Sequence, residues 1–240
     1  MEVHAHTHTA RKKWTHYFWE FLMLFLAVFC GFLAEYQLEH KIEHEREKVL
    51  AQSMYEDLKI DKIALTNAIE SSNTKMSDAE NMLLMLHKPK DTWNDTIIYK
   101  IMTLLFSTFP FETTDGTYQQ MKASGSLRYF NQSLVNLMNA YDNQTKKTVF
   151  RDESEQKALW ELVPFAATII NFEVTGDLRF NRPITHEMYV KIKDKDILDV
   201  FINKVVTVRT MRGRCKQEYE VQLKSVISLL ETLEKKYHLK

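Results

Sequence analysis

The stretch YFWEFLMLFLAVFCGFLAEY, residues 17–36, decides the fold of this 240-residue chain. Its 20 residues carry charge only at Glu20 and Glu35, one near each end. A helix of about 20 mostly apolar residues is long enough to cross the roughly 30 Å hydrocarbon core of a bilayer. Trp14 precedes the stretch and Tyr36 ends it, as expected for amphipathic rings at the level of the lipid headgroups. We therefore predict a transmembrane helix at residues 17–36.

Two other interpretations of residues 17–36 are a buried core helix and a cleaved signal peptide. The fully uncharged part, residues 21–34, would by itself be of borderline length for a span. Basic residues at 11–13 precede it in the manner of a signal peptide. Residues 32–34, Phe-Leu-Ala, however, place a bulky ring where signal cleavage needs a small side chain. We therefore expect an uncleaved signal anchor.

Residues 1–16 form a basic leader with alternating histidines, for which we expect a flexible polar tail. The leader and residues 39–48, on the other side of the span, each hold three Lys or Arg residues, so the positive-inside rule gives a tie. Acidic residues outnumber basic ones only in the second segment. This difference favours a cytoplasmic N-terminus and a C-terminal domain on the opposite side of the membrane.

At about 100° per residue, the membrane helix has two different faces. Aromatic side chains form one stripe, which consists of Phe18, Phe21, Phe25, Phe29, Phe32 and Tyr36. Small residues let helix backbones approach closely, and carboxylates in a span face protein or water rather than lipid. We predict that the opposite face mediates self-association into a homo-oligomer, with the phenylalanines toward lipid. This association face consists of Glu20, Ala27, Gly31, Ala34 and Glu35.

The two carboxylates of the association face also allow a different function. Glu20 and Glu35 would line a cation or proton path if the helices surrounded a pore. The competing interpretation places both residues at the depth of the headgroups, where a carboxylate costs much less than at the bilayer centre. A small oligomeric ion channel or transport accessory is therefore the alternative function.

The composition points to long helices. Only 5 Gly and 4 Pro leave little material for the tight turns of an all-β fold. The 32 basic and 32 acidic residues cancel, and no basic stripe with interleaved aromatic residues is present, so we expect no nucleic-acid partner. Cys30 lies within the apolar stretch, where Cys215 could not meet it, so we expect no disulfide between them.

After residue 36 the helical pattern continues to residue 87 without Gly or Pro. Residues 37–49 are mostly charged and predict a solvated helical stalk, and residues 50–240 predict a helical domain. We expect an all-α fold in which the transmembrane helix continues into a long helix that joins an antiparallel bundle. Further helices are predicted at 92–107, from the turn at 113–116 to about 122 with an end at Gly125, at 131–172 with a kink near Pro164, and at 194–236. Residues 174–183 are predicted to be turn-like, with a short strand as the alternative, and Gly176 is predicted to end the preceding helix.

Catalytic motifs are few. Residues 40–44, His-Lys-Ile-Glu-His, match the inverzincin string, but a charged stalk lacks the third ligand and the shaped cavity of a catalytic zinc site. Phosphate-binding loops, dinucleotide fingerprints and nucleophile elbows are not found. The basic run of Arg209, Arg212, Arg214 and Lys216 is typical of a solvated helix face. We expect a non-enzymatic protein with no cofactor and no metal site.

Residues 117–127, TYQQMKASGSL, resemble the T-Y-x-x-M-K-x-S-G-x-L segment of an uncharacterised family of bacterial single-span membrane proteins, a domain of unknown function. The resemblance implies an anchored helical protein of the bacterial inner membrane, with the domain in the periplasm, and it brings no activity. The motif itself predicts a capped short helix whose side chains pack in the domain. Thr117, Tyr118, Lys122 and Gly125 are alternatively candidates for a ligand site between bundle helices. The function that we expect is a self-associating scaffold or a sensor-like module.

Overall fold

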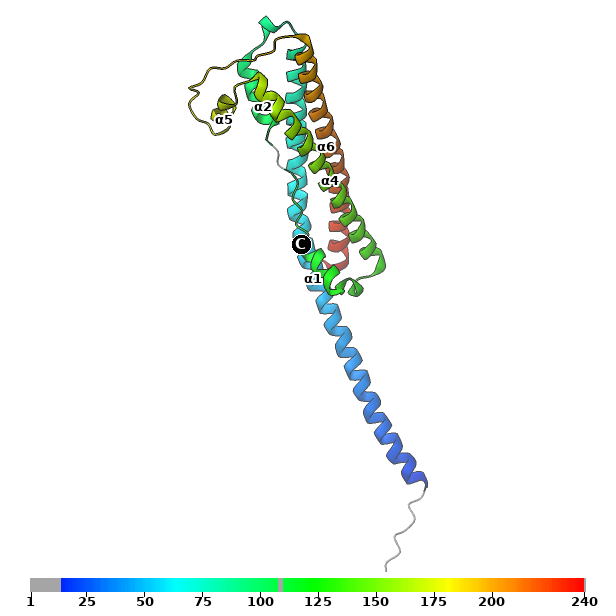
Figure 1. Cartoon of the computed structure of the whole chain (residues 1–240). Coiled ribbons are helices and arrows are strands. Elements are labelled where there is room, and N and C mark those ends of the chain that lie inside the picture. The colour runs from blue at the N-terminus through cyan, green and yellow to red at the C-terminus, as the bar shows by residue number, and fades with distance from the viewer. Residues whose placement is uncertain (1–13, 108–109, 240) are drawn as a thin grey trace, which may run out of the picture. The chain divides into compact units, whose positions relative to one another are not determined.

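The structure is a computed structural model, and it describes residues 14–107 and 110–239 (Figure 1). These residues form helices and no strand, which confirms the all-α prediction. Most of the predicted leader, residues 1–13, lies outside the described residues. The helices are α1 (Trp14–Leu86), α2 (Asp95–Leu105), α3 (Gly116–Ser124), α4 (Gln132–Ile169), α5 (Phe172–Arg179) and α6 (Lys195–Tyr237), with 3-10 turns η1 (Lys90–Thr92) and η2 (Ser126–Tyr129).

Contacts divide the chain into two compact units, Met1–Val49 and Leu50–Lys240. In the first unit, α1 is long and apolar enough to cross a membrane by length and composition, and none of its apolar window is buried. The ring centroids of Phe21 and Phe25 are 6.3 Å apart and those of Phe25 and Phe29 are 5.9 Å apart. Helical geometry therefore aligns these phenylalanines in one stripe.

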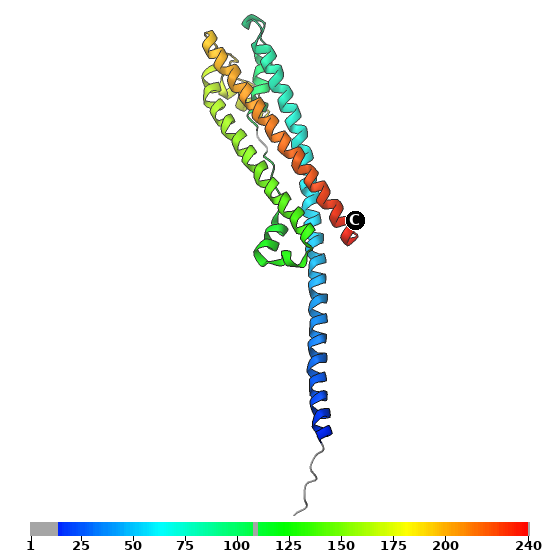
Figure 2. The ribbon, with the colours of Figure 1, turned by 90° about the vertical axis from the view of Figure 1, so that its right-hand side faces the viewer.

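The second unit is a bundle. The part of α1 after Leu50, α4 and α6 lie side by side, and α6 runs opposite to the other two (Figures 1 and 2). The chain returns from the end of α1 to the start of α4 through α2, an extended connection and α3, rather than through one long helix. The described part of the extended connection begins at Pro110 and includes Phe111.

Side-chain caps explain where the bundle helices begin and end. Asn94, Asn131 and Asp194 each accept a hydrogen bond from the backbone N–H three residues later, at 3.1, 2.9 and 2.9 Å. These contacts satisfy backbone donors that a helix start leaves unpaired. Gly125 follows α3 with φ of 70°, the left-handed conformation that glycine adopts at little cost. The predicted helices at 92–107, 131–172 and 194–236 therefore exist, with ends shifted by a few residues.

The prediction of a turn at residues 174–183 was wrong for residues 174–179, which are helical. α4 passes through Pro164 and ends at Ile169, and α5 begins at Phe172 and contains Gly176. Asn171 causes the break, because its side chain accepts from the N–H of Glu173 and starts a new helix. A glycine inside a helix costs only about 1 kcal/mol relative to alanine, so Gly176 does not end one.

Buried side chains of the bundle form two apolar clusters. One lies around Ala79, Leu162 and Val205, and the other around Leu58, Met138 and Leu229. α1, α4 and α6 each contribute to both clusters. Between its two apolar stretches, each of these helices carries buried or half-buried polar residues, which meet in the middle of the bundle.

Candidate functional site: a buried ionic layer

The ionic layer is a set of six polar or ionisable side chains from three helices, at the place where the two apolar clusters meet, and two of them, Cys215 and Tyr219, also belong to the second cluster. Core positions on α4 and α6 recur every three or four residues, and the layer occupies such positions. The side chains on each helix therefore face the same way, toward the neighbouring helices. The layer consists of Lys75 on α1, Asp152 and Glu155 on α4, and Arg212, Cys215 and Tyr219 on α6.

An ion pair between Arg212 and Glu155 forms the centre of the layer. The Arg212 guanidinium donates to a Glu155 carboxylate oxygen, and the two side chains are only 5 % and 4 % exposed. The pair joins α6 to α4. Removing two charges from water is expensive, and a close opposite charge repays much of that cost.

Asp152 takes its hydrogen bonds from neutral donors. The backbone N–H of Phe111 donates to Oδ2 at 3.1 Å, and the hydroxyl of Tyr219 donates to Oδ1. The first bond fixes the extended connection to α4, and the second joins α4 to α6. Asp152 therefore organises three chain segments without a cation of its own in direct contact.

Lys75 brings the second positive charge of the layer. Its ammonium donates to the backbone carbonyl of Ser107, which ties α1 to the end of α2. Burial, followed by repulsion from Arg212, lowers the pKa of Lys75 to about 8, and attraction to Glu155 opposes this shift. The layer thus stabilises the neutral amine relative to the ammonium ion.

The acidic groups of the layer also favour their neutral forms. Burial raises the pKa of Glu155 despite the attraction of Arg212, and it raises the pKa of Asp152 despite the hydrogen bond from Tyr219. The pKa values of Cys215 and Tyr219 are raised by burial and by the neighbouring carboxylates. Titratable groups that share a buried site and shift in this way are common at functional sites.

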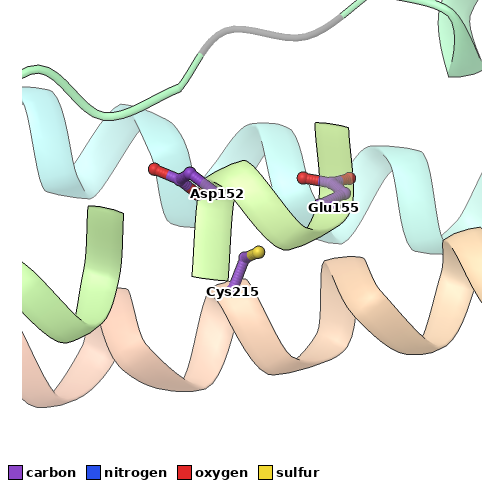
Figure 3. A group of neighbouring side chains, drawn as sticks. All are labelled: Asp152, Glu155 and Cys215. Atoms are coloured by element: carbon purple, nitrogen blue, oxygen red, sulfur yellow. The ribbon is translucent and has the colours of Figure 1, made fainter. Parts of the chain in front are cut away.

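Asp152, Glu155 and Cys215 have the donor types of a metal site. Their ligand atoms lie within 4.8 Å of one another, and Figure 3 shows two acids one turn apart on one helix with the cysteine on the neighbouring helix. Metal binding would require a thiolate, whereas Cys215 holds its proton more tightly than usual. Arg212 already supplies the cation beside Glu155. The arrangement therefore fits an ion-pair network better than a metal centre.

A cavity of about 170 Å³ lies beside the ionic layer. It adjoins the extended connection and α4, and Arg212 reaches it from α6. This layer cavity is lined by Pro110, Phe111, Val149, Asp152, Glu153, Glu155, Gln156 and Arg212. The buried network therefore has direct access to a space that can hold a small molecule.

The candidate residues of the 117–127 motif are placed in packing and capping positions. The Thr117 N–H donates to Asp57 at 3.2 Å, and the Tyr118 hydroxyl, on a side chain only 2 % exposed, donates to Asn139 at 2.7 Å. Lys122 lies 5.2 Å from the Tyr118 ring centroid. None of these residues, nor Gly125, lines the layer cavity. Through these contacts the motif packs α3 against α1 and α4.

Lys122 also takes part in a charge cluster at the edge of the bundle. Its ammonium lies 3.3 Å from Asp142, and that of Lys146 lies 2.7 Å from the same carboxylate oxygen. Burial raises the pKa of Asp142, but the two lysines together bring the pKa below its usual value. Both ammonium groups thus share one carboxylate, which is the pattern of a structural contact.

The predicted association face lies entirely on the exposed surface of α1. Glu20 pairs with His16 one turn earlier, with 3.0 Å between Oε1 and Nε2. Ala27, Ala34 and Glu35 are exposed, and a Cβ added to Gly31 would meet no atom within 4 Å. The face therefore has room for a neighbouring backbone.

Sequence reasoning missed the ionic layer, and its treatment of Arg212 was wrong. Arg209 and Arg214 lie at the surface or near it, as predicted, but Arg212 is buried. The sequence feature that indicates the burial of Arg212 is its spacing, because Arg212 follows Val205 and Val208 on the apolar stripe of α6. A charge on an apolar stripe indicates a buried partner on another helix.

No protein-family model matches this chain, and no curated protein or solved structure matches it either. The resemblance of residues 117–127 to a family of membrane proteins therefore stays a prediction.

Proposed function

We propose that this chain is a single-pass membrane protein in which residues 17–36 anchor a non-enzymatic helical domain, acting as a scaffold or a sensor-like module. One observation carries the proposal: the apolar side chains of α1 in the first unit are exposed. Phe21, Leu24 and Val28 are 66 %, 70 % and 74 % exposed, for example. Burying a side chain of this kind is worth roughly 1.5–3 kcal/mol, so a continuous exposed stretch needs a cover.

A lipid bilayer would cover this apolar stretch better than a protein groove would. Apolar residues occur all around the helix between residues 21 and 34, whereas a groove would require one apolar face and one polar face. Trp14, Trp19 and Tyr36 lie at the two ends, where aromatic rings meet headgroups. By the sequence arguments above, the membrane is the inner membrane of a bacterium, with the N-terminus cytoplasmic and the domain periplasmic.

Membrane insertion is tested by placing charge in the middle of the span. The double change Leu26→Arg and Phe29→Arg should move the protein from the membrane fraction to the soluble fraction after alkaline extraction, because each arginine costs about 2.5–3.5 kcal/mol at the centre of a span. Ile60→Arg with Val221→Arg is the control, since these two exposed bundle residues should leave fractionation unchanged. A wild-type chain that is extracted by alkali would contradict the anchor.

Self-association is proposed to occur through Glu20, Ala27, Gly31, Ala34 and Glu35. In a Cys30→Ser background, oxidation should crosslink the Ala27→Cys variant into dimers in membranes, because small residues allow the closest backbone approach. Phe25→Cys, on the aromatic stripe, is the matched control and should crosslink several-fold less. Equal crosslinking at both positions would argue against a specific face.

The competing function is an ion pathway along Glu20 and Glu35. The contact between Glu20 and His16 at the start of the span supports an interfacial position for this carboxylate. Ion flux through liposomes that contain the full chain, reduced by Glu20→Gln, would favour the channel over the scaffold.

A further inference from the structure

One buried donor in the wall of the layer cavity has no partner. The Nε–H of Arg212 makes no hydrogen bond within the part of the chain that the structure describes, although Nη2 of the same side chain donates to Glu155. Arg212 is buried and lines the layer cavity. A buried N–H without a partner costs about 1–3 kcal/mol, so such donors are normally bonded to protein or to ordered water. An occupant of the cavity that accepts a hydrogen bond would remove this cost.

The charges around the cavity favour a neutral occupant. In the ionic layer, the acids Asp152 and Glu155 are matched by the bases Arg212 and Lys75. Glu153 adds an exposed carboxylate at the rim of the cavity, where it would repel an anion. A cation, in turn, cannot accept the N–H of Arg212. A neutral molecule with a carbonyl oxygen meets both conditions, because this oxygen accepts a hydrogen bond and brings no net charge.

The rest of the wall offers hydrogen-bond acceptors and an apolar surface. Glu153 and Gln156 are exposed residues of α4 whose side-chain oxygens can accept N–H groups at the rim. Pro110, Phe111 and Val149 supply the apolar part of the lining. Water could accept the N–H of the buried arginine, but only an organic molecule would also remove this apolar surface from water.

The volume of the layer cavity limits the size of the occupant. At about 30 Å³ for each water molecule, 170 Å³ holds about six of them, or one organic molecule of similar size. This space is too small for a nucleotide or a peptide.

We propose that the layer cavity binds a small neutral primary amide with a short alkyl chain. The carbonyl oxygen accepts the Nε–H of Arg212, and the amide NH2 group donates to the carboxylate of Glu153. The alkyl chain packs against Phe111 and Val149. This binding site goes beyond the proposed function and does not depend on the membrane anchor.

The test is thermal unfolding of the full chain in detergent at pH 7, with butyramide as the probe. At about ten times the dissociation constant, we expect the unfolding midpoint to rise by about 3–6 °C. Sodium butyrate, which has the same number of non-hydrogen atoms and a negative charge, should give no rise beyond that of sodium chloride at equal ionic strength. 2-Pentanone also has this number of non-hydrogen atoms, but it keeps the carbonyl oxygen without the N–H groups and should give a smaller rise.

Two variants locate the effect in the cavity. Val149→Phe fills the space from its rim, where Val149 is 38 % exposed, and should abolish the butyramide shift without touching an ion pair. Arg212→Lys keeps a positive charge beside Glu155 but lacks the Nε donor, so it should weaken the apparent affinity for butyramide several-fold. Val221→Phe and Arg214→Lys are the controls, because they make the same changes at exposed positions of α6 that do not line the cavity, and they should keep the full shift.

Four results would overturn the proposal: no shift with butyramide, an equal shift with butyrate, an equal shift with 2-pentanone, or an unchanged shift in Val149→Phe. If Arg212→Lys does not fold, Val149→Phe decides the outcome. Extraction of the protein from membranes by alkali would contradict the anchor but not this site.

Discussion

At the scale of single residues, the pairing of Arg212 with Glu155 has the clearest energetic consequence. Both side chains are almost fully buried, so removal of one leaves the other charge out of water and without its hydrogen-bonded counterion. We expect Arg212→Met to lower the free energy of unfolding by about 3–5 kcal/mol in chemical denaturation. Arg214→Met, which removes an exposed arginine from the same helix, should change it by about 0.5 kcal/mol or less.

A double variant separates the ion pair from simple loss of packing. Combining Arg212→Met with Glu155→Gln removes both charges and should recover a large part of the lost stability. If the double variant is as unstable as the sum of the two single variants, the side chains are not coupled in the way that the structure shows.

The lowered pKa of Lys75 predicts that the stability of the folded protein depends on pH. Its pKa is about 8 in the folded protein and 10.5 in its ordinary state, so between these values the unfolded chain binds the additional proton. Unfolding therefore becomes less favourable as the pH rises from 8 to 10.5. The wild type should gain stability relative to Lys75→Met over this interval. Because both proteins keep Cys215 and Tyr219, the difference between their unfolding free energies isolates the lysine, and a constant difference would contradict the shift.

At the scale of elements, most of the helices could be predicted from local chemistry. The caps at Asn131 and Asp194 and the glycine after α3 are local signals, which act within a few residues. Prediction failed at Asn171, where a cap inside a continuous helical pattern divides α4 from α5. Prediction also failed for the ionic layer, because Glu155 and Arg212 lie 57 positions apart and only the packing of α4 on α6 joins them.

The two glycines at the ends of α3 give a matched test of its boundaries. A Cβ at Gly116 or at Gly125 would meet no atom within 4 Å, but only Gly125 has a positive φ, of 70°. Gly125→Ala should therefore destabilise the domain by about 1–2 kcal/mol. Gly116→Ala should be neutral or slightly stabilising in the same denaturation experiment. Equal effects would mean that backbone conformation is not what ends the helix.

At the scale of the whole molecule, the composition indicated helices and the apolar stretch at 17–36 indicated a span, and each conclusion needed only the sequence. The division at Val49 and Leu50 separates a unit whose apolar surface is exposed from a unit with a buried core. We expect membrane insertion and bundle stability to respond to different substitutions. Leu26→Arg with Phe29→Arg should affect the first, and Arg212→Met should affect the second.

The ionic layer also bears on how the bundle avoids alternative packings. Apolar stripes with similar side chains can slide past one another by one helical turn at modest cost. Such a slip of α6 along α4 would move Arg212 from Glu155 to Leu159 in one direction or to Asp152 in the other, and Glu155 would lose the guanidinium that pairs with it. The layer thus fixes the register of the long helices, as a single polar position does in a coiled coil.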